Sequence, residues 1–453
     1  MNNLQIGYAE KIVNPEMGIA IAGYYVPRFA KGILSDLKTI ALAIKSGDDT
    51  AIIVSVDNCE VFADVVQAIK TAVQKKTGIN GDNLFVSATH THTGPCLKAD
   101  RSFLCDEKPI KEYVDYLVNN TVDVCENALK DLKPAKMGYA VGKAPDRIAY
   151  IRRYKMKDGT TMTCPPINDP NIDHPIGELD QRVNVLRFDR EGAESVVIMN
   201  YGLHADTVNG ELISSDWVGW TQETLKKSLD GVKCLCIMGA QGDVGSTHVN
   251  PTKSDMNDTE ISFDNEMKSP GMARFVGRAL AGTVLQVYDK VEYNDVENIK
   301  IINEKFDVEL NVPDKKDLPL AHKYAELHKQ GRDDLIPYEA MELTTVVAEA
   351  LRMVNLENSP KKTVMTMIGL RIGNVALVGI PGEPFTEIGE RVKAIGGYDL
   401  IMPCALTNGY EGYFPSKEAY DEGGYEARTS RFKPTIYDAI INTSDKVLKE
   451  LKQ

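Results

Sequence analysis

A strand–helix–strand pattern near the N-terminus constrains the fold of this chain more than any other feature. Residues 50–56 and 84–88 are short apolar runs typical of buried strands, and between them apolar residues recur at helical spacing over residues 61–77. A crossover helix between two strands implies that the strands pair in parallel, with their carboxyl ends at one edge of the sheet. The pattern therefore predicts an α/β fold with mixed, largely parallel sheets flanked by helices.

The second of these strands ends at two histidines. His90 and His92 follow residues 84–88 directly and precede a Gly-Pro turn. In an open α/β sheet, ligands bind beyond the carboxyl ends of the strands, so imidazoles at this position are candidates for binding chemistry. An extended backbone would keep both rings on one side, whereas a turn would let one bind a metal while the other faces a substrate. Either ring could instead hydrogen-bond a buried backbone group.

Later apolar runs end in the same way. In each case the run stops and a candidate metal ligand follows: His204 after residues 195–200, Glu383 after residues 374–380, and Tyr410 and Tyr413 after residues 400–405. Two histidines and one carboxylate are a recurring ligand set for catalytic zinc, and a weaker oxygen ligand can complete it. Zinc in such a site activates water for the hydrolysis of an amide or ester. The same ligand types also fit Mn or Fe.

Composition limits the partners of the chain. Its 453 residues carry 52 Lys and Arg against 65 Asp and Glu, which gives a formal net charge of -13. Such a charge repels nucleic acids and anionic membrane surfaces, so we expect no nucleic-acid binding and no stable membrane association. The expected partner is a small-molecule substrate, and the sequence is compatible with a homo-oligomer.

Two features favour a cytoplasmic location. The N-terminus has no basic region followed by an apolar core, and no run of roughly eighteen consecutive apolar residues occurs. The 8 cysteines, Cys105 among them, lie mostly within apolar or helical patterns. Such cysteines are typical of reduced core thiols rather than of a disulfide framework or a zinc knuckle.

We interpret residues 1–453 as one large catalytic domain. Within it, residues 312–360 are charged and helix-rich and lie between two strand-like runs, which predicts a peripheral helical insertion. A glycine-rich loop at residues 239–246 lets the backbone approach a ligand closely. This loop lacks the G-x-x-x-x-G-K-[ST] pattern, so we do not interpret it as a phosphate-binding loop.

Several motifs, taken in order along most of the chain, resemble those of the neutral/alkaline, non-lysosomal ceramidases. The matches are residues 89–95 to T-H-T-H-[ST]-G-P, His204 to a strand-end histidine, Gly242, Asp243 and Val244 to a G-D-V-S loop, residues 381–383 to P-G-E, and Asn408, Tyr410, Tyr413, Glu418, Tyr425 and Glu426 to N-x-Y-x-x-Y…E…Y-E. Each motif is modestly specific, but their common order is a strong signal. The resemblance implies a neutral ceramidase-like zinc hydrolase in which zinc-activated water cleaves an amide (N-acyl) bond.

The resemblance also implies roles for individual residues. The zinc ligands would be His90, His204, Glu383 and Tyr413, and the groups around the scissile carbonyl would be His92, Arg152 and Tyr425. The substrate-binding residues would be Arg153, Asp243, Ser246 and Tyr410. A fixed guanidinium and a phenol near a developing oxyanion supply charge stabilisation. His92 and Glu387 are the candidates for a general base.

Alternative interpretations remain open. Gly245 stands where the family has Ser, and no β-rich C-terminal domain is matched, which favours a soluble non-lipid substrate such as an acylated amine, ester, lactone or sugar derivative. An amidohydrolase barrel also begins with H-x-H at a strand end, but it needs several later strand-end ligands, and His204 is the only later strand-end histidine. A binding protein that kept the fold and lost catalysis would bind zinc without turnover.

Overall fold

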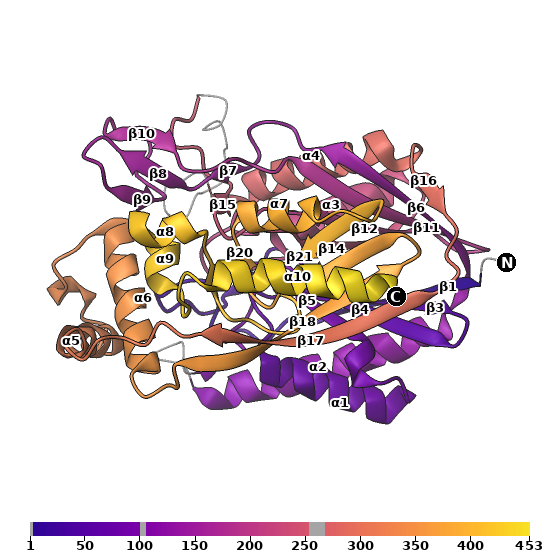
Figure 1. Ribbon diagram of the computed structural model, residues 1–453, viewed down its shortest axis with the longest axis horizontal. Coiled ribbons are helices and arrows are strands. Elements are labelled where there is room, and N and C mark those ends of the chain that lie inside the picture. The colour runs from indigo at the N-terminus through magenta and orange to yellow at the C-terminus, as the bar shows by residue number, and fades with distance from the viewer. Residues whose placement is uncertain (1–2, 100–105, 253–267) are drawn as a thin grey trace.

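Two β-sheets packed face to face form the centre of the computed structural model, which describes residues 3–99, 106–252 and 268–453 (Figure 1). The larger sheet has 9 strands in the order β14-β12-β11-β6-β1-β3-β4-β5, with β16 paired to β6. Its strands are β1 (Leu4–Ile12), β3 (Lys38–Ser46), β4 (Asp49–Val56), β5 (Leu84–Ala88), β6 (Lys133–Lys143), β11 (Arg182–Arg190), β12 (Val196–Tyr201), β14 (Lys233–Met238) and β16 (Glu292–Asn294). The smaller sheet consists of β17 (Ile299–Glu309), β18 (Lys362–Ile372), β19 (Val375–Gly379) and β21 (Leu400–Cys404).

Helices cover the outer face of each sheet. The larger sheet is covered by α1 (Ala63–Thr77), α2 (Glu107–Lys130), α3 (Asp216–Ser228) and α4 (Pro270–Tyr288), and the smaller sheet by α7 (Thr386–Ala394) and α10 (Ile436–Lys452). Figure 1 shows α10 lying across the front of the smaller sheet and α1 and α2 along the lower side of the molecule. The architecture is therefore helix–sheet–sheet–helix.

Alternation along β4 shows why its sequence is a continuous apolar run. Ile52 and Val54 pack into the core beneath the helices, whereas Ala51 and Ile53 pack into the core between the two sheets. Successive side chains of a strand point to opposite faces, so a strand buried on both faces needs apolar residues at every position. Each fully buried Ile or Val contributes roughly 1.5–3 kcal/mol relative to exposure.

The predicted strand–helix–strand unit is confirmed, since β4 and β5 pair in parallel on either side of α1. The same arrangement recurs in β12-α3-β14 and in β19-α7-β21. The α/β class with mixed sheets flanked by helices is likewise confirmed, but most other strand pairs are antiparallel, so parallel pairing is less extensive than predicted. The reason is connection length: β3 and β4 are joined by a tight turn at Gly47, whose φ is 60°, and a short turn can join only antiparallel strands.

The larger sheet curls so that its edge strands β5 and β14 approach each other beneath the end of β21. Ala405 donates its backbone N–H to Met238 at the end of β14 (2.9 Å), and Ala88 at the end of β5 donates to Leu406 (3.2 Å). Asn408, with a φ of 58°, receives the Val86 N–H on its Oδ1 at 2.9 Å. The carboxyl ends of strands from both sheets therefore meet in one place.

The remaining elements are short. They are β2 (Gly32–Ile33), β7 (Tyr150–Ile151), β8 (Arg153–Met156), β9 (Thr161–Thr163), β10 (Ile172–Pro175), β13 (Leu212–Ile213), β15 (Val244–Gly245), β20 (Glu383–Pro384), β22 (Tyr413–Phe414), α8 (Lys417–Glu422), α9 (Tyr425–Thr429) and the 3-10 turn η1 (Gly81–Asn83). The segment 312–360 forms α5 (Leu318–Lys329), the turn η3 (Asp333–Leu335) and α6 (Ala340–Leu356). It is helical as predicted, and its status as an insertion within a single domain stays a prediction.

Most of the described cysteines are buried, and Cys164 is exposed. Cys125, Cys234, Cys236 and Cys404 are free thiols buried in the hydrophobic cores, as predicted, while Cys105 lies outside the described residues. In the part of the chain that the structure describes, every helix is too short or too polar to cross a membrane.

Candidate metal centre

Three buried side chains from different strand ends converge on one point. The Nε2 atoms of His90 and His204 each lie 3.1 Å from Oε2 of Glu383. The three side chains are 2%, 1% and 0% exposed, respectively. His90 follows β5 and His204 follows β12 of the larger sheet, whereas Glu383 follows β19 of the smaller sheet, so the two sheets contribute jointly to the centre.

Backbone carbonyls fix the orientation of both imidazoles. Nδ1 of His90 lies 2.7 Å from the Cys59 oxygen, and Nδ1 of His204 lies 2.9 Å from the Val244 oxygen. A carbonyl oxygen can only accept, so each Nδ1 donates and each neutral ring keeps its lone pair on Nε2. Both lone pairs therefore face Glu383 Oε2.

This donor set fits a metal cation. Glu383 Oε2 is buried and accepts no hydrogen bond from the described residues. A carboxylate oxygen and two imidazole lone pairs in a buried site repel one another unless a cation lies among them. The ligand-capable atoms of His90, His204 and Glu383 all lie within 4.8 Å of one another, which is compact enough for one ion.

The electrostatics of the centre also favour positive charge. Burial lowers the pKa of His90, but the charge of Glu383 more than offsets burial and raises it. Burial and then the Arg152 guanidinium lower the pKa of His204 to about 4, which keeps this ring neutral and able to bind metal. Although burial opposes ionisation of Glu383, its histidine partners hold the pKa of its carboxyl well below the usual range.

A second candidate group, Cys59, His90 and His92, is weaker. Cys59 Sγ lies 3.8 Å from Nδ1 of His90, but that nitrogen already donates to the Cys59 carbonyl. Binding a metal through Nδ1 would break this hydrogen bond and turn Nε2 away from Glu383. The group containing Glu383 is therefore the better metal site.

The backbone turns at His90 rather than staying extended. Its φ is 62°, in the left-handed region that residues other than glycine rarely adopt. His92 nevertheless directs its Nε2 to within 3.4 Å of His90 Nε2. Thr91 between them donates its hydroxyl to the Ser214 carbonyl at 2.6 Å, which helps to hold the turn. Backbone strain of this kind, about 1–3 kcal/mol per residue, is concentrated at functional sites.

Arg152 is held beside the centre by several partners. Its Nε donates to Oε1 of Glu426 at 2.7 Å, and one of its terminal nitrogens donates to the Tyr413 hydroxyl at 3.0 Å. The other terminal nitrogen lies 3.2 Å from His204 Nε2. Burial opposes the charge, but Tyr413 and Glu426 raise the pKa of Arg152, which keeps it a fixed cation.

Tyr413 lies next to Glu383 because β20 and β22 pair in parallel, with Glu383 and Tyr413 as register partners. Tyr425 packs edge-on against Tyr413, with the ring centroids 5.6 Å apart. Tyr410 donates its hydroxyl to Oε1 of Glu383 at 2.8 Å. The oxygen of Glu383 that does not face the histidines is thereby satisfied.

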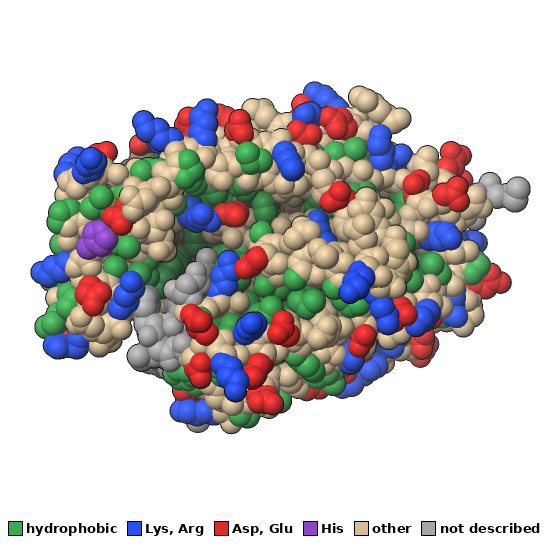
Figure 2. Space-filling model, turned by 90° about the horizontal axis from the view of Figure 1, so that it is seen from below, with side chains coloured by type: hydrophobic (Ala, Val, Ile, Leu, Met, Phe, Trp, Pro, Cys, Tyr) green, Lys and Arg blue, Asp and Glu red, His purple; other side chains and the backbone are tan. Residues whose placement is uncertain are grey.

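A cleft of about 520 Å³ opens from the centre toward α6. Apolar and aromatic side chains form much of its wall: Val26, Phe62, Leu97, Leu351, Val354 and Tyr25. His90, His92 and Glu383 lie along it, together with Tyr410, Tyr413 and Tyr425. In Figure 2 the molecule is hollowed beside the end that carries α5 and α6, and hydrophobic side chains gather in the hollow. Its volume is within the range of about 300–1,000 Å³ usual for small-molecule sites.

The structure brings only some of the predicted substrate-binding residues to this cleft. Tyr410 lines it, whereas Arg153, Asp243 and Ser246 are absent from its described lining. Asp243 accepts hydrogen bonds from the backbone and hydroxyl of Thr386 at the start of α7. Arg153 donates to Glu422 and to the Gly423 carbonyl, away from the centre. The substrate-binding role of these residues stays a prediction.

The sequence did not identify the role of every residue near the centre. Glu387, the second general-base candidate, is exposed on α7 and accepts from the Tyr437 hydroxyl, so only His92 of the pair faces the centre. Glu426 belongs to a matched motif, yet its anchoring of Arg152 could not be read from the motif. Asp206 lies two residues after His204, the same spacing that separates His90 from His92, and this spacing is the signal that could have identified it.

Comparisons with curated proteins find distant relatives, and no family model matches the chain. Neutral ceramidase A of Dictyostelium discoideum is 25% identical over 263 residues, which span 54% of this chain and 36% of that protein. Neutral ceramidase B of the same organism is 24% identical over an alignment of 488 residues, which covers 90% of this chain and 66% of that protein. The chain thus spans less than two thirds of the length of these relatives.

Solved structures share the fold. The neutral ceramidase of Pseudomonas aeruginosa matches with a TM-score of 0.74 and 17% identity, covering 100% of this chain and 75% of that chain. A ceramidase complexed with C2 matches with a TM-score of 0.73 and 17% identity, covering 100% of this chain and 76% of that chain. The fold described above is therefore the fold of those structures.

Proposed function

Because this chain is a relative of the neutral ceramidases in its sequence motifs and its fold, we propose that it is a zinc-dependent hydrolase of an amide (N-acyl) bond. One observation carries the proposal: the Nε2 atoms of two buried imidazoles each lie 3.1 Å from Oε2 of Glu383, which accepts no hydrogen bond from the described residues. His90, His204 and Glu383 would hold the zinc, with Tyr413 as a fourth, weaker ligand. When bound, zinc supplies Lewis acidity that activates water and polarises a carbonyl oxygen.

The chain's own residues would stabilise charge around the scissile carbonyl. Arg152 is fixed by Glu426 and lies next to Tyr413, so its guanidinium needs little reorganisation to face an oxygen that gains negative charge. Tyr425, whose ring lines the same cleft, would donate its hydroxyl to that oxygen. Removing one such preorganised donor typically slows catalysis by about 10²–10³-fold.

His92 would handle the proton. Its Nε2 faces the centre without a backbone partner, and burial lowers its pKa well below the usual value, so the ring is neutral near pH 7. A neutral imidazole can accept a proton at Nε2 and return it to the departing amine, a role worth about 10²–10⁴-fold in rate.

The cleft supports a substrate with an acyl chain. Phe62, Leu97, Leu351 and Val354 offer an apolar wall close to the metal ligands, which suits a hydrocarbon chain better than a sugar. The relatives are named as ceramidases, and ceramide is an N-acyl compound of this kind. Charged side chains also line the cleft, Lys98, Lys329 and Glu411 among them, and these favour the second candidate, a soluble acylated amine.

The test combines metal content with hydrolysis. We expect about one zinc per chain in the purified protein and release of free fatty acid from short-chain N-acyl sphingosine. A His90→Ala, Glu383→Ala double variant should lose both the zinc and the activity. Glu387→Gln, which alters an exposed carboxylate close by in sequence, is the matched control and should retain both. A zinc-loaded wild type that hydrolyses neither N-acyl sphingosine nor soluble acylated amines would exclude the proposal.

A further inference from the structure

The two ring nitrogens of His92 face different surroundings. Nε2 lies 3.4 Å from Nε2 of His90, at the metal centre. Nδ1 lies 3.7 Å from Oδ1 of Asp206 and makes no hydrogen bond to the described residues. The ring therefore stands between the reaction centre and a carboxylate, as in sites where an acidic residue orients a general base.

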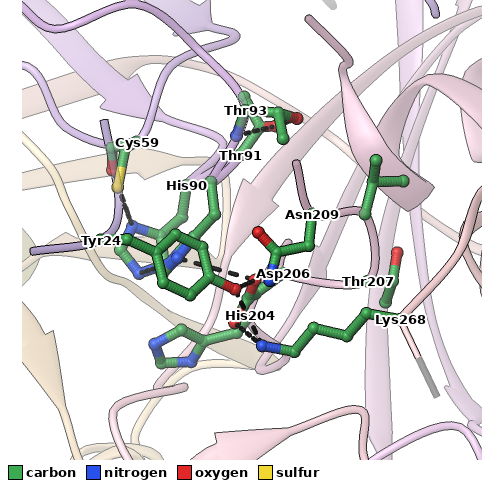
Figure 3. Close-up of polar contacts among 12 residues, drawn as sticks. Tyr24, Cys59, His90, Thr91, Thr93, His204, Asp206, Thr207, Asn209 and Lys268 are labelled. Carbon is green, nitrogen blue, oxygen red and sulfur yellow. Dashed lines mark hydrogen bonds and ion pairs between the residues drawn. The ribbon is translucent and has the colours of Figure 1, made fainter. Parts of the chain in front are cut away.

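Asp206 is held in place by two donors. The Tyr24 hydroxyl donates to its Oδ1 at 2.5 Å, and Lys268 Nζ donates to its Oδ2 at 2.9 Å. Lys268 also donates to the Tyr24 hydroxyl at 2.8 Å, which closes a triangle of contacts. Figure 3 shows Tyr24, Asp206 and Lys268 joined in this way beside His90 and His204. With both oxygens engaged by donors, Asp206 is a fixed negative charge.

The rest of the surroundings confine the His92 ring. The Tyr24 ring packs edge-on against it, with the centroids 5.5 Å apart. On the same loop, Gly23 lies so close that a Cβ there would come within 2.8 Å of the imidazole. Arg28 donates to the His92 carbonyl at 2.7 Å and to Asn209 at 3.2 Å, which ties the histidine backbone to the segment that carries Asp206.

A fixed carboxylate beside Nδ1 selects one tautomer. A proton on Nδ1 is attracted to Asp206, whereas a lone pair there would be repelled. The present separation of 3.7 Å is longer than a hydrogen bond. Catalytic hydrogen bonds are often long before substrate binds and tighten afterwards.

We propose that Asp206, fixed by Tyr24 and Lys268, is a positioning residue that keeps the proton of His92 on Nδ1 and directs the Nε2 lone pair at the reacting groups. The inference rests on the proposed hydrolytic function for its catalytic consequence, because His92 is the group that would handle the proton. The tautomer itself does not depend on which substrate is cleaved.

The kinetic test uses Asp206→Asn, which keeps the size of the side chain. The amide can turn its NH₂ toward Nδ1 and so favour the wrong tautomer. We expect kcat to fall by about 10²–10⁴-fold, with KM changed less than roughly threefold and zinc content unchanged. Combining Asp206→Asn with His92→Ala should slow the enzyme no further than His92→Ala alone, since both act through one ring. Tyr24→Phe should cause a smaller loss than Asp206→Asn, because Lys268 still holds the carboxylate.

A second readout separates this inference from the proposed function. The nitrogen NMR shifts of His92 in the zinc-loaded protein, identified by their loss in His92→Ala, should indicate an Nδ1-protonated ring that becomes Nε2-protonated in Asp206→Asn. An Nε2-protonated ring in the wild type, or the same tautomer in both proteins, overturns the inference whether or not a substrate is known. So does a folded Asp206→Asn enzyme whose kcat stays within a few fold of wild type. A wild type without activity but with the expected tautomer change would instead refute only the proposed function.

Discussion

Arg152 and Glu426 form a buried ion pair, with Nε of the arginine 2.7 Å from Oε1 of the glutamate. Thr163 donates its hydroxyl to the other oxygen of Glu426 at 2.7 Å, so the carboxylate is satisfied on both sides. The pair holds a cation beside His204 and Tyr413, and its carboxylate partner Glu426 lies outside the proposed ligand set. The position of this charge follows from α9, which carries Glu426 and packs against the β8–β9 hairpin.

Replacing Arg152 should therefore affect the chemical step more than the fold. For Arg152→Lys we expect kcat to fall by about 10²–10³-fold. The guanidinium contacts Glu426 and Tyr413 simultaneously, whereas a lysine ammonium cannot reach both. Zinc content should stay at the wild-type level. Steady-state kinetics with an N-acyl substrate and metal analysis of the same sample check this.

Arg153→Lys is the matched control. Arg153 is 2% exposed and donates to Glu422 rather than to the centre. Its replacement should lower the free energy of unfolding, by about 1–3 kcal/mol, and leave kcat within a few fold of wild type. If Arg153→Lys slows the reaction as much as Arg152→Lys does, the assignment of Arg152 is wrong.

Removing the metal should destabilise the protein. A ligand that binds only the folded state adds about 2.7 kcal/mol at one hundred times its Kd, and without a cation the centre leaves Glu383 Oε2 buried and unpartnered. Chelation should thus lower the melting temperature, and added zinc should restore it. In Glu383→Gln the chelator should have little effect, because the carboxylate that completes the ligand set is gone. An equal shift in wild type and Glu383→Gln would mean that zinc binds elsewhere.

The convergence of His90, His204 and Glu383 was predictable because each follows an apolar strand. In the sequence, the end of each strand is marked by the point where a continuous apolar run stops. That two separate sheets supply them was not predictable, since periodicity reports which residues are buried and not which strands pair. The same limit explains why the extent of parallel pairing was overestimated.

Two features of the site could not be predicted from the sequence. They are which of Arg152 and Arg153 faces the centre, and which residues contact His92. Adjacent residues of a strand point to opposite faces, so only the register of β7 and β8 decides which arginine faces the centre. Tyr24 lies in an irregular loop and Lys268 follows a segment outside the described residues, and neither carries a pattern that links it to His92. Contacts between loops distant in sequence depend on side-chain packing, which leaves no local signature.

Asp57 should make the stability of the protein depend on pH. Burial raises the pKa of this carboxyl to about 6, against an ordinary value of about 3.9. Between about pH 4 and pH 6 the folded chain retains a proton that the unfolded chain has released, so the contribution of Asp57 to stability falls as the pH rises through this window. Above about pH 6 the buried carboxylate is ionised and costs roughly 3 kcal/mol.

Asp57→Asn should remove this cost. The amide oxygen can accept from the Lys38 backbone, and the amide nitrogen can donate to the Thr89 hydroxyl, so both contacts of the carboxylate persist. Measured by denaturant unfolding at the same zinc concentration, the variant should gain up to about 3 kcal/mol relative to wild type between pH 4 and pH 7. Asp64→Asn, which removes an exposed carboxylate, controls for the loss of one negative charge. If the difference in the free energy of unfolding between Asp57→Asn and wild type does not change with pH, the pKa of Asp57 is not raised in the folded protein.

The wall of the cleft offers a test of the substrate class. Leu351 on α6 lines the cleft, and burying a leucine-sized surface contributes roughly 1.5–3 kcal/mol, so Leu351→Asp should raise KM for a long-chain N-acyl substrate by about 10–100-fold. For an acetyl amide, which has no chain to place there, KM should change little. Leu335→Asp alters a leucine that is 51% exposed on η3 and absent from the described lining of the cleft, and it should leave both KM values unchanged. If Leu351→Asp leaves KM for the long-chain substrate at the wild-type value, and wild type binds long-chain and acetyl substrates with the same KM, the apolar wall does not bind the acyl chain. That result would favour a soluble acylated amine as the substrate.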